Sequence, residues 1–328
     1  MKPDGGIVVI GGGTGLSTML RGLKKHTDNI TAIVTVMDDG GGSGVLRSDL
    51  GMLPPGDIRN CIVALSNAEP FMKKLLSYRF ADGNLHGQSF GNLFLAALNG
   101  VTGSFYDAVI KMSDVLNISG RVLPVTVEDV HLVAEFENGV SVKGESKIAD
   151  AKREENSRIS RIKIVPEKPQ ALRDAINAIL QARLIVFGPG SLYTSIIPNL
   201  LVEGVVDAIR LSRAKKVYVC NVMTQGGETE GYTAFDHVKA FFDHSCSGIF
   251  DTCIVNSEEI PASLQKRYAK EGAEKIVVEE ELFEKAGIKL YAAPLLNTGG
   301  NLARHDSEKL ARVLMEILGE SNDIFWNS

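Results

Sequence analysis

Two short stretches near the start of the chain are apolar at every position, or nearly so, and a segment with helical spacing lies between them. The stretches are 7–10 (IVVI) and 30–37 (ITAIVTVM), and both are rich in β-branched residues. Between them, over 16–25, apolar positions recur with the period of a helix. Strands that are apolar on both faces are typical of a parallel sheet that helices cover on both sides. The pattern therefore predicts a βαβ unit at the start of a doubly wound fold.

The rest of the pattern divides the chain into an α/β core and a β-rich insert. Alternating apolar and polar positions begin near 120, and Asn138-Gly139 between two such runs indicates a hairpin. The polar stretch 149–160 is interpreted as a solvated turn or a short helix. Strands are predicted at 183–187, 216–222, 251–256 and 289–293, and helices at 57–67, 70–79, 89–99, 169–180, 191–197, 235–244 and 306–318. We therefore predict one Rossmann-like α/β core with a mostly parallel sheet, 1–118 and 167–328, and a small β-rich insert at 119–166.

Composition and charge narrow the classes of partner. The 328 residues are 44% hydrophobic and 23% charged, as in ordinary globular proteins, and the formal net charge is -5. An acidic chain lacks the basic surface expected of a nucleic-acid binder. No apolar run is long enough for a membrane span, and the first residues lack the apolar core of a secretory signal. We expect a cytoplasmic protein with a small-molecule ligand, and the four cysteines as reduced thiols of the core.

The first candidate site is the glycine-rich turn between the first predicted strand and helix, within IVVIGGGTGLSTML. Glycines let the backbone approach an anion, and the free amides at a helix start supply positive potential. The spaced-glycine pattern of dinucleotide-binding proteins is incomplete, because Thr18 occupies the place of the third glycine. A tight turn without a ligand is the alternative. The residues predicted to bind phosphate here are Gly11, Gly12, Gly13, Thr14 and Gly15.

The second candidate is the connection at 37–60, MDDGGGSGVLRSDLGMLPPGDIRN. Its Asp38-Asp39 pair stands where an acid binds a ribose in Rossmann proteins, and adjacent carboxylates can also hold Mg²⁺ or simply cap a turn. Arg59, near the start of the next predicted helix, could bind a phosphate or pair with the two acids, or lie on an ordinary helix surface. Another helix start, GQSFGN, adds an amide side chain. The ligand-binding residues predicted in this half are Asp38, Asp39, Ser43, Asp57, Arg59, Asn60 and Asn92.

A second strand-glycine-helix sequence, LIVFGPGSLYTSIIPN, repeats the logic of the first. Because the carboxyl ends of parallel strands meet at one edge of a sheet, both glycine turns are expected to face one crevice. The stretch VCNVMTQ ends another buried strand and places polar side chains at the same edge. No nucleophile elbow or phosphate-binding Walker loop is present. The residues predicted to bind ligand are Gly188, Gly190, Ser191, Asn221 and Thr224, and no catalytic residue is assigned.

Together, these motifs resemble the gluconeogenesis factor family, the YvcK branch of the CofD-like proteins. The other branch is the phospholactate transferase of deazaflavin cofactor biosynthesis. The resemblance rests on GGGTGLS at 11–17, DDGGGSGVLR at 38–47, PPGDIRN at 54–60, SFGNL at 89–93, FGPGSLYTSIIPNLL at 187–201 and NVMTQGGET at 221–229. It implies a Rossmann-like CofD fold and a role in growth, cell shape and envelope maintenance on gluconeogenic carbon sources. It also implies UDP-sugar binding, notably of UDP-N-acetylglucosamine, rather than deazaflavin binding.

The resemblance also directs attention to two residues of the C-terminal part. Arg304, expected at the start of the last helix, suits a diphosphate, and Tyr268 could stack on a base. A surface arginine and a half-buried tyrosine are the alternatives. Three hypotheses follow: a nucleotide-sugar-binding regulator, a Mg²⁺-dependent transferase of a phospho-linked group from a nucleotide donor, and an NAD-binding protein. For the regulator we expect protein partners not yet identified and a homo-oligomer.

Overall fold

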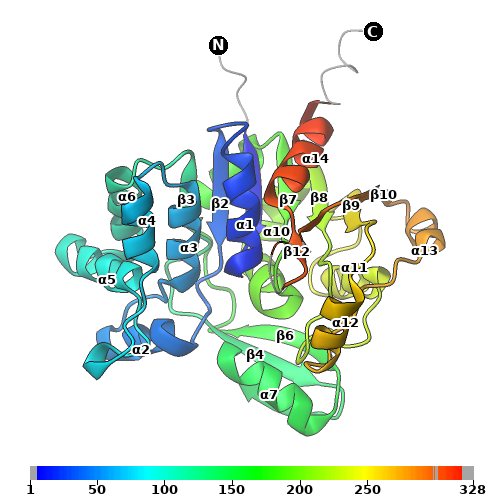
Figure 1. Ribbon diagram of the computed structural model, residues 1–328, viewed down its shortest axis with the longest axis horizontal. Coiled ribbons are helices and arrows are strands. Elements are labelled where there is room, and N and C mark those ends of the chain that lie inside the picture. The colour runs from blue at the N-terminus through cyan, green and yellow to red at the C-terminus, as the bar shows by residue number, and fades with distance from the viewer. Residues whose placement is uncertain (1–5, 298, 300–301, 320–328) are drawn as a thin grey trace.

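The chain folds around one seven-stranded sheet, all of whose strands are parallel (Figure 1). The computed structural model describes residues 6–297, 299 and 302–319. The strand order is β10-β9-β8-β7-β1-β2-β3. The strands are β1 (Ile7–Gly11), β2 (Ile30–Val34), β3 (Arg121–Pro124), β7 (Leu184–Phe187), β8 (Lys215–Val219), β9 (Thr252–Asn256) and β10 (Lys289–Ala293). From β1 the chain adds β2 and β3 on one side, and it then crosses back to add β7, β8, β9 and β10 on the other side of β1. This is the doubly wound topology that the apolar runs predict.

Each strand of the sheet centre contributes to two apolar cores, one on each face. In β1, Ile7 and Val9 face one core whereas Val8 and Ile10 face the other, because side chains of a strand alternate. The first core is covered by α1 (Gly13–Leu23), α3 (Gly56–Leu65), α5 (Phe90–Thr102), α6 (Phe105–Val115) and α14 (Ser307–Gly319). The second is covered mainly by α8 (Arg173–Gln181), α9 (Ile197–Leu200), α10 (Val205–Leu211) and α11 (Ala234–Asp243). The predicted fold class is confirmed.

A separate antiparallel sheet, in the order β5-β4-β6, packs against the second core. Its strands are β4 (His131–Phe136), β5 (Ser141–Lys143) and β6 (Ile159–Val165), and α7 (Glu145–Glu155) connects the last two. In Figure 1 these strands and α7 lie together below the main sheet. The insert was predicted from 119 onward, but its first strand, β3, pairs with β2 at the edge of the main sheet. A short apolar run does not indicate which sheet it joins.

The largest difference from the prediction lies in the connection 37–60. It is not a loop throughout, because α2 (Gly41–Leu50) forms within it. The glycines and the few apolar positions give little helical pattern, and the helix is held by tertiary contacts. Arg47 is buried, forms an ion pair with Asp129, and donates a hydrogen bond to the carbonyl of Val130 at 2.7 Å.

The remaining elements are short, and most lie at the periphery. They are α4 (Pro70–Ser77), the 3₁₀ turn η1 (Gly83–Leu85), the π-helical turn η2 (Leu192–Ile196), α12 (Ala262–Ala269), α13 (Glu280–Lys285) and the two-stranded pair β11 (Leu296–Asn297) and β12 (Arg304–His305). Helix α14 lies beside α1 in Figure 1. Gly22 permits this approach, because a Cβ there would lie 1.9 Å from the carbonyl oxygen of Ser307. No single helix within the described ranges is long and apolar enough to span a membrane.

Candidate functional site

The first glycine turn lies where β1 ends and α1 begins, beside the end of β7. Gly12 is the N-cap residue of α1 and provides no side chain to cap the helix. Gly13 has a φ of +69°, in the left-handed region that favours glycine. The first-turn amides of an α-helix have no partner within the helix. The turn therefore presents amides to a ligand at the point where the strand order reverses, which is where doubly wound sheets bind ligands.

The second glycine turn follows β7 and is held by a side chain from the next strand-end loop. The Gly190 amide donates to Oδ1 of Asn221 at 3.3 Å, and Nδ2 of Asn221 donates to the Gly190 carbonyl at 2.8 Å. The hydroxyl of Ser191 donates to Oε1 of Gln225 at 2.8 Å. The two turns are in contact, because a Cβ on Gly15 would lie 2.6 Å from the carbonyl oxygen of Pro189. Both turns thus form one wall, as the sequence predicts.

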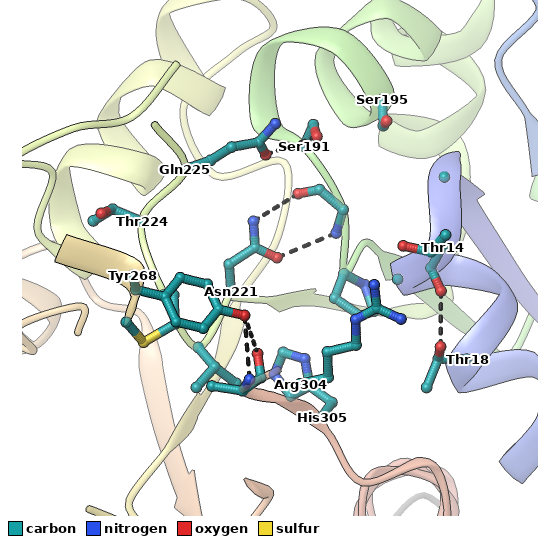
Figure 2. Close-up of a pocket in the computed structure, with 17 residues that line it drawn as sticks. Thr14, Thr18, Ser191, Ser195, Asn221, Thr224, Gln225, Tyr268, Arg304 and His305 are labelled. Carbon is teal, nitrogen blue, oxygen red and sulfur yellow. Dashed lines mark hydrogen bonds between the residues drawn. The ribbon is translucent and has the colours of Figure 1, made fainter. Parts of the chain in front are cut away.

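A pocket of about 350 Å³ opens between these turns, the Asn221 loop and the C-terminal segment (Figure 2). Its lining is rich in backbone amides and hydroxyl groups, and no carboxylate belongs to it among the residues that the structure describes. Thr18, Ser195, Gln225 and His305 also line it, although the predicted set does not contain them. The predicted residues that line it are Gly13, Thr14, Gly15, Gly190, Ser191, Asn221, Thr224, Tyr268 and Arg304. Gly11, Gly12 and Gly188 belong to the same turns without lining the pocket.

Tyr268 and Arg304 occupy the wall opposite the second glycine turn. Tyr268 lies on α12, and its hydroxyl contacts the backbone of Ala303, accepting from the amide at 3.2 Å and lying 3.4 Å from the carbonyl oxygen. Arg304 is in β12, not at the start of α14 as predicted. Figure 2 shows its guanidinium extending into the pocket toward Thr14 and Thr18. Arg304 forms no ion pair with any residue that the structure describes, so its charge is available to a ligand.

The acidic pair does not line the pocket. Asp38 accepts hydrogen bonds from the Gly40 amide at 2.8 Å and from the Ser43 side chain. Asp39 instead accepts from the amide of Ser146, at the start of α7, at 2.8 Å. The two carboxylates are thus oriented toward different segments. In 6–297, 299 and 302–319, no three His, Cys, Asp or Glu side chains are arranged to hold a metal ion.

Asp57 lies directly behind the first glycine turn. It interacts with the Gly13 amide, and its Oδ2 would be 2.6 Å from a Cβ on Gly12. Burial raises the pKa of Asp57 to about 6, with the nearby charge of Asp38 adding to the effect. Burial also raises the pKa of Glu145 to about 8, and the negative charges of Asp38 and other nearby acids raise it further. We refer to Asp38, Asp57 and Glu145 as the acidic group. It adjoins the first glycine turn through Asp57, and none of its three members lines the pocket.

Arg59 does not pair with Asp38 or Asp39. It is 8% exposed, and its Nε donates to Oδ1 of Asn92 at 3.1 Å, so it links α3 to α5. Asn60 is half-buried on α3 and, like Arg59 and Asn92, does not line the pocket. The sequence predicts one crevice for all these residues. The structure separates Asp38 and Asp39 from the second glycine turn. The two acids follow β2, and β2 pairs with β1 on the side opposite β7.

His305 is a pocket residue for which the sequence offers no signal. It is 7% exposed and has a backbone hydrogen bond with Cys220. Burial lowers the pKa of its imidazole to about 4, so the ring is neutral near pH 7. No residue pattern marks it, because β12 is a two-residue strand whose placement depends on tertiary packing.

Comparison with known proteins finds relatives that match this chain over nearly its whole length. A protein of Thermoanaerobacterium thermosulfurigenes is 58% identical over 312 residues, which cover 95% of this chain and 96% of the relative. The gluconeogenesis factor of Bacillus subtilis is 48% identical over 315 residues, covering 96% and 98%. The crystal structure of protein BH3568 from Bacillus halodurans has a TM-score of 0.92 at 46% identity, covering 95% of this chain and 99% of that one.

The family assignment follows from the extent of a second match. The family described as 2-phospho-L-lactate transferase CofD matches residues 7–296, which include both glycine turns and the acidic group. The resemblance inferred from the motifs is confirmed. The chain therefore belongs to the CofD family, and its curated relatives within that family include proteins named gluconeogenesis factor.

Proposed function

We propose that the chain is a cytoplasmic nucleotide-sugar-binding regulator that binds UDP-N-acetylglucosamine in the pocket between the two glycine turns. In this proposal the bound state supports growth and maintenance of cell shape and envelope on gluconeogenic carbon sources. The observation that carries the proposal is the lining of the pocket, which within the described part of the chain combines helix-start amides and one unpaired arginine with no carboxylate. Such a lining favours a phosphate-bearing ligand and repels none of its charge.

The parts of the ligand are assigned by chemistry. Thr14 and Gly15, in the first turn of α1, line the pocket, and the guanidinium of Arg304 extends toward Thr14 (Figure 2), so helix-start amides and a cation are available to one diphosphate. The ring of Tyr268 offers a stacking surface for the uracil. The side chains of Thr224 and Gln225 provide hydrogen-bonding groups for the hydroxyl and amide groups of the sugar.

A regulatory role is supported by the scarcity of proton-transfer groups near the pocket. Its only imidazole among the described residues is His305, which is buried and whose pKa is lowered to about 4 by burial. A binding site requires groups that position a ligand, whereas hydrolysis or transfer requires a nucleophile, a base or a charge clamp at the reacting atom.

A transferase is the second candidate, and the acidic group favours it. Burial raises the pKa of Asp57 to about 6, close to the range in which a carboxyl can act as a general base. Asp38 lies close enough for its charge to raise this pKa further, and such carboxylates are ligands that Mg²⁺ accepts. If Mg²⁺ bound there, it would supply electrostatic stabilisation of a transferring phosphoryl group.

NAD is a third ligand candidate. In the main sheet β3, β2 and β1 lie in that order, and β7, β8, β9 and β10 continue the sheet on the other side of β1, which is the arrangement of dinucleotide-binding domains. The pocket would hold its diphosphate in the same way as that of a nucleotide-sugar.

Calorimetric titration with UDP-N-acetylglucosamine, NAD and GTP, with and without Mg²⁺, tests the proposal, followed by a product assay on the tightest ligand. We expect UDP-N-acetylglucosamine to bind most tightly and to remain unchanged. Asn221→Ala should weaken binding about tenfold, since it releases both hydrogen bonds that hold Gly190. Asn67→Ala, at an exposed asparagine bonded to Ser119, is the matched control. Turnover of the ligand would contradict the regulator, and equal affinity in both variants would contradict the pocket assignment.

A further inference from the structure

A second cavity, of about 420 Å³, adjoins the ligand pocket along the flank of α1. Three arginines line it: Arg21 from α1, Arg267 from α12 and Arg304 from β12. We refer to it as the arginine pocket. It shares Thr18, Arg304 and His305 with the ligand pocket, so the two cavities are neighbours.

The arginine pocket contains cations without counter-ions. No carboxylate lines it, and none of its three guanidinium groups forms an ion pair with a residue that the structure describes. The two acids that follow Arg304 in the sequence are engaged elsewhere. Asp306 accepts from the amides that begin α14, and Glu308 pairs with Lys25 at 2.9 Å. In a chain with a net charge of -5, three unpaired arginines around one cavity form a local field of opposite sign.

The arrangement holds two of the arginines together in spite of their repulsion. Nη2 of Arg21 donates to Oγ1 of Thr18 at 3.0 Å, which keeps the guanidinium along α1 at the edge of the ligand pocket. Burial lowers the pKa of Arg21, and the charge of Arg304 lowers it further, so the two groups feel one another's field. An anion between them would relieve that repulsion, and guanidinium groups bind phosphate oxygens through paired hydrogen bonds.

We propose that the arginine pocket is a second anion site that binds a phosphoryl group next to the ligand pocket. The phosphoryl group has two possible sources: an additional phosphate on the ligand that occupies the ligand pocket, or free phosphate or pyrophosphate. The first source rests on the proposed nucleotide-binding function, whereas the second does not. In both cases Arg21 and Arg267 are binding residues that the diphosphate of a nucleotide-sugar does not require.

Calorimetric titration of the full chain with pyrophosphate, without nucleotide, tests the site. The wild-type chain should bind pyrophosphate, and the Arg21→Gln/Arg267→Gln double variant should bind it at least about tenfold more weakly, since it loses charge-assisted hydrogen bonds. Arg210→Gln, at an exposed position in the last turn of α10, is the matched control and should bind as the wild type does. No binding to the wild type, or equal binding to the double variant, would overturn the proposal. Unfolding curves of each variant verify that the fold is retained.

Two further titrations distinguish the sources. If pyrophosphate binds to protein saturated with UDP-N-acetylglucosamine, the site takes a free anion. If NADP binds more tightly than NAD, and the double variant abolishes that difference, the site takes a phosphate of the ligand itself. The proposed function can fail independently, because loss of UDP-N-acetylglucosamine binding leaves the pyrophosphate result intact. Conversely, nucleotide binding that depends on Asn221, together with pyrophosphate binding that the double variant leaves unchanged, would leave the proposed function intact and refute the second site.

Discussion

Because of Glu228, the free energy of unfolding of the protein should fall as the pH rises, which is opposite to the usual effect of a carboxylate. Its side chain is 3% exposed. It accepts hydrogen bonds from the hydroxyl of Thr194 at 2.9 Å, from Nε2 of Gln225 at 3.1 Å and from the amide of Tyr193 at 3.3 Å. Glu228 thus joins the residues that follow the second glycine turn to the loop that contains Gln225. Burial raises its pKa from 4.5 to about 7, against the opposing effect of these hydrogen bonds.

The magnitude follows from the two pKa values. Folding favours the protonated carboxyl, so this contribution to stability is fully present below pH 4.5 and is lost as the pH rises through about 7. The shift corresponds to about 3 kcal/mol between the two limits. Glu228→Gln removes the ionisable group while retaining its size, and it should be more stable relative to wild type at pH 8 than at pH 5 by roughly that amount.

Urea unfolding of both proteins at intervals between pH 5 and 8 measures this difference. The matched control is Glu230→Gln, two residues away, because the pKa of Glu230 is lowered: burial raises it, but the hydrogen bonds from Lys152 and the Gly227 amide and the nearby positive charges together outweigh burial. Its contribution is present above pH 4.5 and lost only as the pH falls below that value, so its variant should differ from wild type by a nearly constant amount over the same range. A constant difference for Glu228→Gln as well would refute the reasoning.

Three further predictions concern the walls of the pocket and the docking of the small sheet. Gly15→Ala should destabilise the chain by about 1–3 kcal/mol in urea unfolding, because its Cβ would lie 2.6 Å from a backbone oxygen of the second glycine turn. The control for this variant is Gly100→Ala, in α5, where a Cβ would meet nothing within 4 Å; it should stabilise the chain by about 0.5–1 kcal/mol. Tyr268→Phe, which keeps the ring, should retain UDP-N-acetylglucosamine affinity in calorimetry, whereas Tyr268→Ala should lose about tenfold; equal losses would exclude stacking. Nε2 of His244 accepts from the Ile162 amide at 2.8 Å, and burial lowers the pKa of this imidazole. The stability that His244 contributes is therefore present above pH 6.5 and lost as the pH falls below it. The protection factor of the Ile162 amide, its exchange rate relative to an unfolded chain at the same pH, should therefore fall in acid in the wild type and not in a His244→Gln variant.

The sequence predicts the parts of this structure that depend on local pattern. The apolar runs predict β1 and β7, and also β8, β9 and β10, which continue the sheet from β7 to one edge. A strand that is buried on both faces needs apolar residues throughout. The strand-glycine-helix order also predicts that both glycine turns share one edge of the sheet. Asn221 and Thr224 follow from the same rule, because they come after a strand of that sheet.

The parts that depend on tertiary contacts are not predicted. The helix α2 lacks an apolar periodicity and is held by Arg47 contacts from a segment about 80 residues away. Asp38 and Asp57 do not line the pocket, which depends on how the connection after β2 and the start of α3 pack against the first glycine turn. The arginine pocket combines residues from α1, α12 and β12, and no motif contains more than one of them.

The most direct test of the account is a crystal structure of the chain grown with UDP-N-acetylglucosamine. We predict that the diphosphate lies between the first turn of α1 and Arg304, with the uracil against Tyr268 and the sugar near Thr224 and Gln225. A diphosphate bound at Asp38 and Asp57, or a pocket that stays empty at a ligand concentration that saturates the protein in solution, would contradict it.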